Sequence, residues 1–351
     1  MGMIAGGLIL SFYSVVGGWV LSYLYRAVTF QLAGQELDFG VLFNSLIQNP
    51  WEVILAQGAF ILINVFIVRA GIKGGIEAAS KFMMPILFIF FIILAIRSLT
   101  LDGAMEGIRF MFIPDWSYLT FDTLLLALGQ AFFSLSVGIT CMITYASYLS
   151  RKEKIVSSAF NVAWMNIAIS ILAGLVIFPA VFALGYTPDQ GPGLVFVMIP
   201  AVFEQLPFGS LLLIIFFILL LFATVTSSIS MLEIVVSVGI GDQPSKRKKA
   251  TTWFALAIFI VGIPSALSYG VLSDFTIANR SIFDFVDFIT NSIMMPVGGL
   301  FISIFAGYYY SKKIAQDELE TSPIIFTLWR LSVRYVAPIG ILIILIRGII
   351  G

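Results

Sequence analysis

The stretch "FFSLSVGITCMITYASY", residues 132–148, decides the fold because it interrupts an apolar segment long enough to cross a membrane. The surrounding run, residues 123–150, carries no charge, yet it contains Ser134, Ser136 and Gly138. Serine hydroxyls compete with helical hydrogen bonds, and glycine costs about 1 kcal/mol relative to alanine inside a helix. We therefore expect the helix to unwind here, where its freed backbone groups hold a substrate and an ion. Small residues at a close helix–helix contact are the alternative explanation of this segment.

The composition is that of a membrane protein. Of the 351 residues, 60% are hydrophobic and 11% are charged, whereas soluble domains carry about 25% charged residues. The formal net charge is zero, so no overall field favours nucleic acid as a partner. Histidine is absent and Cys141 is the single cysteine, which excludes a disulfide framework, a cysteine metal cluster and the commonest general base. We expect an all-α polytopic membrane protein rather than an enzyme.

The gaps between charged residues predict about nine transmembrane helices, since a span needs about 20 mostly apolar residues. They cover residues 2–33, 51–69, 76–97, 122–149, 156–186, 207–240, 250–272, 282–310 and 325–349. The first is not expected to be a cleavable signal peptide, because no lysine or arginine precedes it and its apolar run is too long.

The cationic residues predict a cytoplasmic N-terminus and an extracellular C-terminus, because cytoplasmic connections carry an excess of lysine and arginine. The run "PSKRKK", residues 244–249, fits such a loop, and a lipid-surface anchor is its alternative interpretation. The residues expected on the cytoplasmic side are Arg69, Lys73, Lys81, Arg151, Lys152, Lys154, Lys246, Arg247, Lys248, Lys249, Lys312, Lys313, Arg330 and Arg334.

A second polar stripe lies in "FATVTSSISMLE", residues 222–233. Its small and hydroxyl residues recur at i, i+3, i+4 and i+7, which places Ala223, Thr226, Ser227 and Ser230 on one helix face. Two hydroxyls and a nearby carbonyl are neutral oxygen ligands that suit Na⁺ better than Mg²⁺ or Ca²⁺, which normally demand carboxylates. Hydroxyls that bond back to their own helix are the alternative.

Two pairs of polar residues share a spacing of one helical turn. Asn166 and Ser170 have it in one predicted span, and Gln130 and Ser134 have it in another. Buried amides are costly unless they are satisfied, so these four side chains could form a polar cage for an ion.

Two acids, Asp284 and Asp287, lie at the outer end of the predicted span 282–310. Acids at a helix N-terminus are ordinary partners of the helix dipole, which explains one of them. Carboxylates that point into a vestibule would instead act as a gate.

These stretches, in this order, resemble the neurotransmitter:sodium symporter family of Na⁺-coupled amino-acid and amine transporters. The stretches that carry the resemblance are "GIKGGIEAASKFMMPILF", "QAFFSLSVGITCMITYASYLSRKE", "PGLVFVMIPAVFEQLP", "FATVTSSIS" and "FDFVDF". The resemblance runs along the whole chain. It implies a LeuT-type fold, in which two inverted repeats of five helices form one transmembrane domain over residues 1–351. Residues 1–121 would be spans 3–5 of a first repeat, 122–310 the complete second repeat and 311–351 a further span. The chain would then be truncated, beginning at the family's third span.

The resemblance also implies roles for single residues. The Tyr13 hydroxyl would meet the substrate carboxylate, and Phe133 would be an aromatic lid. The remaining walls of the substrate site would be Ile9, Ser136, Ile139 and Met231. A first sodium site would use Ser134 and Asn166, and a second would use Ala223, Thr226 and Ser227. Asp287, with Asp284 beside it, would form the outer gate.

The implied function is sodium-coupled symport of a neutral, hydrophobic or aromatic amino acid by alternating access. The uncharged set Gln130, Ser134, Asn166 and Ser170 resembles that of chloride-dependent animal members, so chloride is expected as a second ion. A non-transporting fragment and another Na⁺- or H⁺-coupled carrier of the same fold are the alternatives. The expected partners are the amino acid and the lipid bilayer of the cell membrane. We expect no nucleic acid, and a monomer or weak homo-oligomer.

Overall fold

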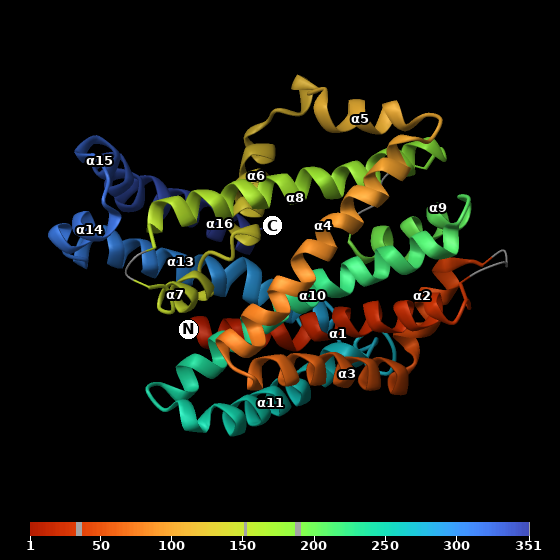
Figure 1. Cartoon of the computed structure of the whole chain (residues 1–351), viewed down its shortest axis with the longest axis horizontal. Coiled ribbons are helices and arrows are strands. Elements are labelled where there is room, and N and C mark those ends of the chain that lie inside the picture. Colours follow the sequence, from red (N-terminus) through yellow and green to blue (C-terminus); the bar gives the residue numbers. More distant parts are fainter. Residues whose placement is uncertain (33–36, 151–152, 187–190, 351) are drawn as a thin grey trace. The chain divides into compact units, whose positions relative to one another are not determined.

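The computed structural model of the chain describes residues 1–32, 37–150, 153–186 and 191–350. Arg151 and Lys152, which the orientation prediction uses, lie outside these ranges. The described residues are mostly helical, and their β-type pairing is one isolated bridge between Ile277 and Arg280. The chain therefore has the all-α architecture that its composition predicts (Figure 1).

Eight helical segments among the described residues are long and apolar enough to cross a membrane. They are Gly2–Val28, Pro50–Arg69, Ile72–Leu99, Ile155–Ala183, Gly209–Ile240, Pro244–Leu267, Ile282–Tyr309 and Pro323–Ile349. Each corresponds to one of the nine predicted spans. The remaining prediction, 122–149, is a broken helix made of α6 (Phe121–Ser134) and α7 (Cys141–Ala146).

Several spans combine an α-helix with a π-helical or 3-10 turn, and shorter helices connect them. The α-helices not yet given are α1 (Gly2–Val28), α2 (Phe39–Gln48), α3 (Pro50–Arg69), α4 (Ala78–Leu99), α5 (Ala104–Phe112), α8 (Ile155–Ala183), α9 (Ile199–Glu204), α10 (Gly209–Ile240), α11 (Arg247–Leu267), α12 (Ile282–Phe288), α13 (Met295–Ile304), α14 (Lys312–Leu319), α15 (Pro323–Leu331) and α16 (Ala337–Ile350). The π-helical turns are η1 (Ile72–Glu77), η3 (Leu194–Met198), η5 (Ile289–Met294), η6 (Phe305–Tyr309) and η7 (Ser332–Val336), and the 3-10 turns are η2 (Trp116–Tyr118) and η4 (Pro244–Lys246).

Local capping explains where several of these helices begin. The Asn49 side chain accepts a hydrogen bond from the Glu52 amide at the start of α3, and Pro50 occupies the first helical position. The Thr120 hydroxyl accepts from the Thr123 amide at the start of α6. Such caps satisfy backbone donors that the first turn of a helix leaves without partners.

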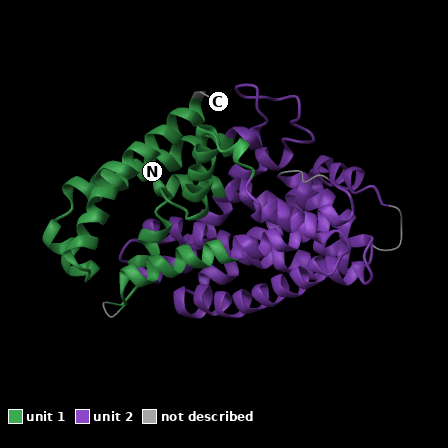
Figure 2. Ribbon diagram, turned by 90° about the horizontal axis from the view of Figure 1, so that it is seen from above, with its two compact units in different colours: residues 1–9, 115–168, 286–351 green, residues 10–114, 169–285 purple. Residues whose placement is uncertain are grey.

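The chain divides into two compact units, which Figure 2 colours green and purple. Unit 1 comprises residues 1–9, 115–168 and 286–351, and unit 2 comprises residues 10–114 and 169–285. The chain passes between the units inside α1, α8 and α12 and in the loop after Pro114. The predicted division into repeats at residue 121 follows a different criterion and stays a prediction.

Unit 2 is built around α10, which packs against α3, α4, α9 and α11. Large aromatic side chains fill the space beside α1: Tyr23 is fully buried and contacts Phe196 and Phe217 at centroid distances of 5.2 and 5.1 Å. At Gly18 an added Cβ would lie 2.7 Å from the Gln57 backbone nitrogen, so α1 and α3 approach closely only because this position is glycine.

Unit 1 joins the broken helix to the C-terminal spans. An ion pair links Asp122 at the start of α6 to Arg347 near the end of α16. The Ser303 hydroxyl on α13 donates to the Val333 carbonyl oxygen at 2.6 Å and so bridges to η7. These contacts position the interrupted segment within its unit.

Candidate functional site

The expected break in the fourth predicted span is present. Helix α6 ends at Ser134, α7 begins at Cys141, and the residues between them form turns. Three residues of the turn have a positive φ: Ser136 at 53°, Gly138 at 99° and Thr140 at 63°. Non-glycine residues rarely adopt this left-handed conformation, and they keep it only where the surrounding structure imposes it. The strain marks the segment as a candidate binding site.

Gly138 also makes the close helix contact that was the alternative explanation of this segment. A Cβ added at Gly138 would lie 2.1 Å from the Met295 carbonyl oxygen and 3.0 Å from the Gly299 amide nitrogen. A Cβ at Gly298 would in turn lie 2.3 Å from the Gly138 oxygen. The two explanations therefore hold together: the chain is unwound, and its glycine packs backbone to backbone against α13.

The two residues predicted for the first sodium site lie together in unit 1. The Asn166 side-chain amide on α8 donates to the Ser134 hydroxyl at 3.2 Å. Ser134, the last residue of α6, also donates to the Ala131 carbonyl oxygen at 3.3 Å. Hydroxyl and amide oxygens are the neutral ligands that suit a monovalent cation. The pair thus combines an irregular backbone with neutral oxygens.

The other two members of the predicted polar cage extend from this pair along their own helices. Gln130 is exposed and lies one turn before Ser134 on α6, and Ser170 is exposed and lies one turn after Asn166 on α8. Ser170 belongs to unit 2 and the other three belong to unit 1.

The hydroxyl stripe of α10 has the predicted helical form. Thr226 is half-buried and Ser227 is exposed, whereas the neighbouring Thr224, Val225 and Ser228 are buried. The stripe predicted to bind the second sodium ion is thus the open face of α10.

The alternative for this stripe is also observed, because its hydroxyls bond back to their own helix. The Thr226 hydroxyl donates to the carbonyl oxygens of Phe222 and Ala223 at 2.9 and 3.0 Å. The Ser230 hydroxyl donates to the Thr226 carbonyl oxygen at 3.1 Å. Donation uses the hydroxyl proton and leaves the oxygen lone pairs available. The Thr226 hydroxyl oxygen can therefore still coordinate a cation.

A side-chain contact connects two roles that the resemblance had assigned separately. The Tyr13 side chain on α1 lies within hydrogen-bonding reach of the Ser227 side chain on α10, and both residues belong to unit 2. The predicted partner of a substrate carboxylate thus contacts a predicted sodium ligand directly. A substrate carboxylate bound by the tyrosine would therefore lie next to a sodium ion bound by the serine.

The remaining predicted substrate residues fall in both units. Ile9 and Ile139 in unit 1 are buried, and Phe133 in the same unit is exposed. Ser136 lies in the turn of unit 1, and Met231 lies half-buried one turn after Ser227 on α10 in unit 2. Their joint role as pocket walls stays a prediction.

The two predicted gate acids have different surroundings. Asp284 lies in the first turn of α12, where it accepts from the Ser281 hydroxyl at 2.6 Å and from the Tyr269 hydroxyl at 3.2 Å. These contacts are those of an ordinary helix-start acid. Asp287 lies one turn further along and accepts from the Asn291 amide at 2.6 Å. The gate role of the two acids stays a prediction.

Two polar contacts beneath the α10 stripe were not predicted from the sequence. The buried Ser228 hydroxyl donates to Asn64 of α3 at 2.6 Å, and the fully buried Glu233 pairs with Arg247. Arg247 also donates to the Val68 carbonyl oxygen at 3.0 Å. An acid and an amide inside apolar spans were the available signals, since such groups persist in a membrane only with partners.

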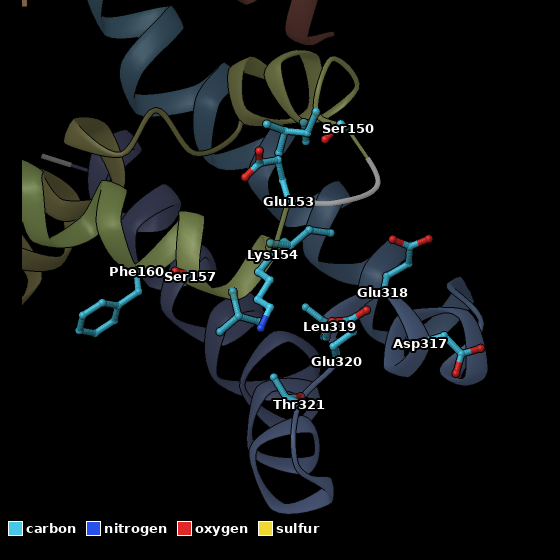
Figure 3. A pocket seen from close by; sticks show the side chains of 14 residues that line it. Ser150, Glu153, Lys154, Ser157, Phe160, Asp317, Glu318, Leu319, Glu320 and Thr321 are labelled. Atoms are coloured by element: carbon cyan, nitrogen blue, oxygen red, sulfur yellow. The ribbon is translucent and has the colours of Figure 1, made fainter.

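A cavity of about 720 Å³ lies elsewhere in unit 1 and contains none of the predicted site residues. It is lined by the end of α7, by Ser150 and Glu153, by the start of α8, and by the end of α14 with the two residues after it. Figure 3 shows acidic side chains on its rim, among them Glu153, Asp317 and Glu318. This cavity does not belong to the candidate site.

The chain is similar to known transporters over most of its length. The sodium:neurotransmitter symporter family matches residues 42–351. An uncharacterized sodium-dependent transporter of Bacillus subtilis is 46% identical over 99% of this chain and 78% of the relative, and one of Haemophilus influenzae is 36% identical with the same coverage. The crystal structure of MhsT in complex with L-phenylalanine matches with a TM-score of 0.91 and 44% identity, over 99% of this chain and 80% of the MhsT chain.

Proposed function

The chain belongs to the sodium:neurotransmitter symporter family, and from this we propose that it carries a neutral amino acid by alternating access. Sodium-coupled symport across a membrane is the function of the family, and the chain has the LeuT-type fold. The proposal adds the class of substrate, the residues that bind it and the accompanying ions. It also places the N-terminus in the cytoplasm, on the distribution of lysine and arginine.

The observation that carries the proposal is the contact between the Tyr13 and Ser227 side chains. A substrate carboxylate bound by the Tyr13 hydroxyl would lie beside a cation bound by Thr226 and Ser227. The opposite charges then stabilise each other in a medium of low dielectric constant, where such attraction is strong. Binding of either one would favour binding of the other, and this mutual dependence is the basis of coupling.

A hydrophobic or aromatic side chain is the proposed distinguishing feature of the substrate. Met231 lies one turn from Ser227, and Ile9 lies one turn from Tyr13. The predicted walls contain no carboxylate that could pair with a substrate amine lacking its own acid group. MhsT, with 44% identity, has L-phenylalanine bound in its crystal structure, which supports the same class of substrate.

Binding of labelled L-phenylalanine to the full chain tests this class. We expect binding in Na⁺ but not in K⁺, and competition by leucine but not by dopamine or lysine. Equal competition by dopamine would contradict the amino-acid assignment, because it would show that a carboxylate is not required. Equal binding in Na⁺ and K⁺ would contradict sodium coupling at this site.

We further propose that transport depends on chloride. Gln130, Ser134, Asn166 and Ser170 are all uncharged, so none of them balances the charge of a nearby sodium ion. An uncompensated ion in low dielectric costs several kcal/mol, which an anion would offset. We expect replacement of chloride by gluconate to reduce uptake at least tenfold, and Ser170→Glu to remove that dependence by supplying a fixed carboxylate. Ser210→Glu, an equal change in charge at the start of α10, is the control. Equal uptake in the two anions would overturn this part of the proposal.

A further inference from the structure

A second cavity in unit 1, separate from the transport site, is lined by three cationic side chains. It measures about 150 Å³, and its lining residues come from the start of α14, from α15 and from η7. Figure 1 labels α14 and α15. Its cations are Lys312, Arg330 and Arg334, and its other lining residues are Phe326, Thr327, Leu331 and Tyr335. No carboxylate is among them.

The guanidinium groups in this cavity have unused donors. Nη1 of Arg330 and Nε of Arg334 are buried from solvent and have no hydrogen-bond partner among the described residues. Among the described residues, none of the four ion pairs involves Lys312, Arg330 or Arg334. Buried charged donors without partners are costly, so the cavity favours an anion that accepts several hydrogen bonds.

Charges on α14 are separated between its two ends. Lys312 at the first position lines the basic cavity, whereas Asp317 and Glu318 at the other end line the larger cavity of Figure 3. Asp317 and Glu318 therefore do not line the basic cavity, where they would balance the charge of its three cationic side chains. The two cavities offer opposite electrostatic environments.

Neighbouring contacts hold Arg334 in place. Its guanidinium carbon lies 4.4 Å from the centre of the Tyr308 ring, a cation–π geometry, and the Tyr308 hydroxyl donates to the Arg334 carbonyl oxygen at 3.3 Å. Gly307 lets the two segments approach, since an added Cβ there would lie 3.0 Å from the Arg334 Cα. Arg334 itself lies on the π-helical turn η7, an irregularity that often marks functional positions in helices.

We propose that this cavity binds the phosphate of an anionic phospholipid headgroup. Tyr308 and Tyr309 end the span Ile282–Tyr309 and Tyr310 follows it, and tyrosines gather where spans meet the headgroup region. Leu328, Leu331 and Val336 beside the cavity are exposed apolar side chains that acyl chains can cover. A basic cavity between spans with apolar surface next to it fits a lipid better than a soluble anion.

Native mass spectrometry of the purified full chain, titrated with phosphatidylglycerol, tests the proposal. Lys312→Gln and Arg330→Gln should each weaken binding about fivefold, the effect of removing one charge near the headgroup. Lys313→Gln is the matched control, because Lys313 is the adjacent exposed lysine of α14 and does not line the cavity. Lys312 is exposed, so its variant also remains informative if Arg330→Gln destabilises the fold.

The lipid source is separated from free phosphate by competition. We expect phosphatidylcholine with the same acyl chains to bind less tightly, and millimolar inorganic phosphate to leave bound phosphatidylglycerol in place. Equal losses in Lys312→Gln and Lys313→Gln would overturn the site. Displacement by inorganic phosphate would show a soluble-anion site and overturn the lipid assignment.

Discussion

Two threonines of α10 allow a test of ion binding that is independent of helix packing. Thr226 and Thr224 both donate their hydroxyl protons to carbonyl oxygens of their own helix, at 3.0 Å or less. They lie on different faces of the helix: Thr226 is half-buried on the hydroxyl stripe, and Thr224 is buried. A change to valine removes one oxygen in each case and nearly conserves volume. The pair therefore distinguishes a ligand from a structural hydroxyl.

We expect Thr226→Val and Ser227→Ala each to raise the Na⁺ concentration for half-maximal uptake at least fivefold, since each loses an oxygen ligand. Thr224→Val should leave that concentration unchanged. The measurement is initial uptake of labelled phenylalanine into proteoliposomes over a range of Na⁺ concentrations. An unchanged half-maximal concentration in both stripe variants would remove them from the second sodium site.

Tyr13→Phe should lower the affinity for the amino acid by about 1.5–3 kcal/mol, the value of a lost hydrogen bond to a charged group. Tyr23→Phe is the matched control, because Tyr23 lies on the same helix and its buried hydroxyl has no hydrogen-bond partner in the part of the chain that the structure describes. Equilibrium binding of labelled phenylalanine gives both affinities. Equal affinities in the two variants would leave Tyr13 as a packing residue.

At the scale of elements, the sequence predicted the break in the fourth span correctly but did not identify what the break contacts. Serine and glycine in a charge-free span indicate that a helix is weakened, and the turn with positive φ at Gly138 agrees. Helical periodicity in the sequence assigns a residue to one face of its helix, but it does not identify the residue that this face contacts. The contact between Gly138 and Met295, and the bond between Asn64 and Ser228, join residues more than 150 positions apart and depend on the folded arrangement.

Gly138→Ala should lower stability by about 1–3 kcal/mol and abolish uptake, because alanine is strained at φ 99° and its Cβ would meet the Met295 oxygen. Gly129→Ala, at a helical position on α6 with open space around it, should be neutral or slightly stabilising. Thermal unfolding of the purified variants measures the difference. Equal unfolding temperatures would show that the turn relaxes easily and that its strain is not maintained.

At the scale of the whole molecule, composition alone predicted an all-α membrane protein, and eight of the nine predicted spans are continuous helical segments. The short helices α2, α5, α9 and α14 were not predicted, because none is long enough to cross a membrane. The substrate roles and the first sodium site came from the resemblance. The hydroxyl stripe of α10 indicated Na⁺ from its residues alone, but neutral hydroxyls at helical spacing also occur in ordinary packing. The contact between Tyr13 and Ser227, which lie 214 positions apart, is one of the features that depend on the folded chain.

The most direct test of sodium-coupled symport is uptake of labelled L-phenylalanine by proteoliposomes that contain the full chain. We expect accumulation above the external concentration under an inward Na⁺ gradient, and loss of that accumulation when the gradient is dissipated. An inward H⁺ gradient without Na⁺ should give only equilibration. Accumulation that follows the H⁺ gradient, or sodium-dependent binding without any accumulation, would contradict sodium-coupled symport of an amino acid by this chain.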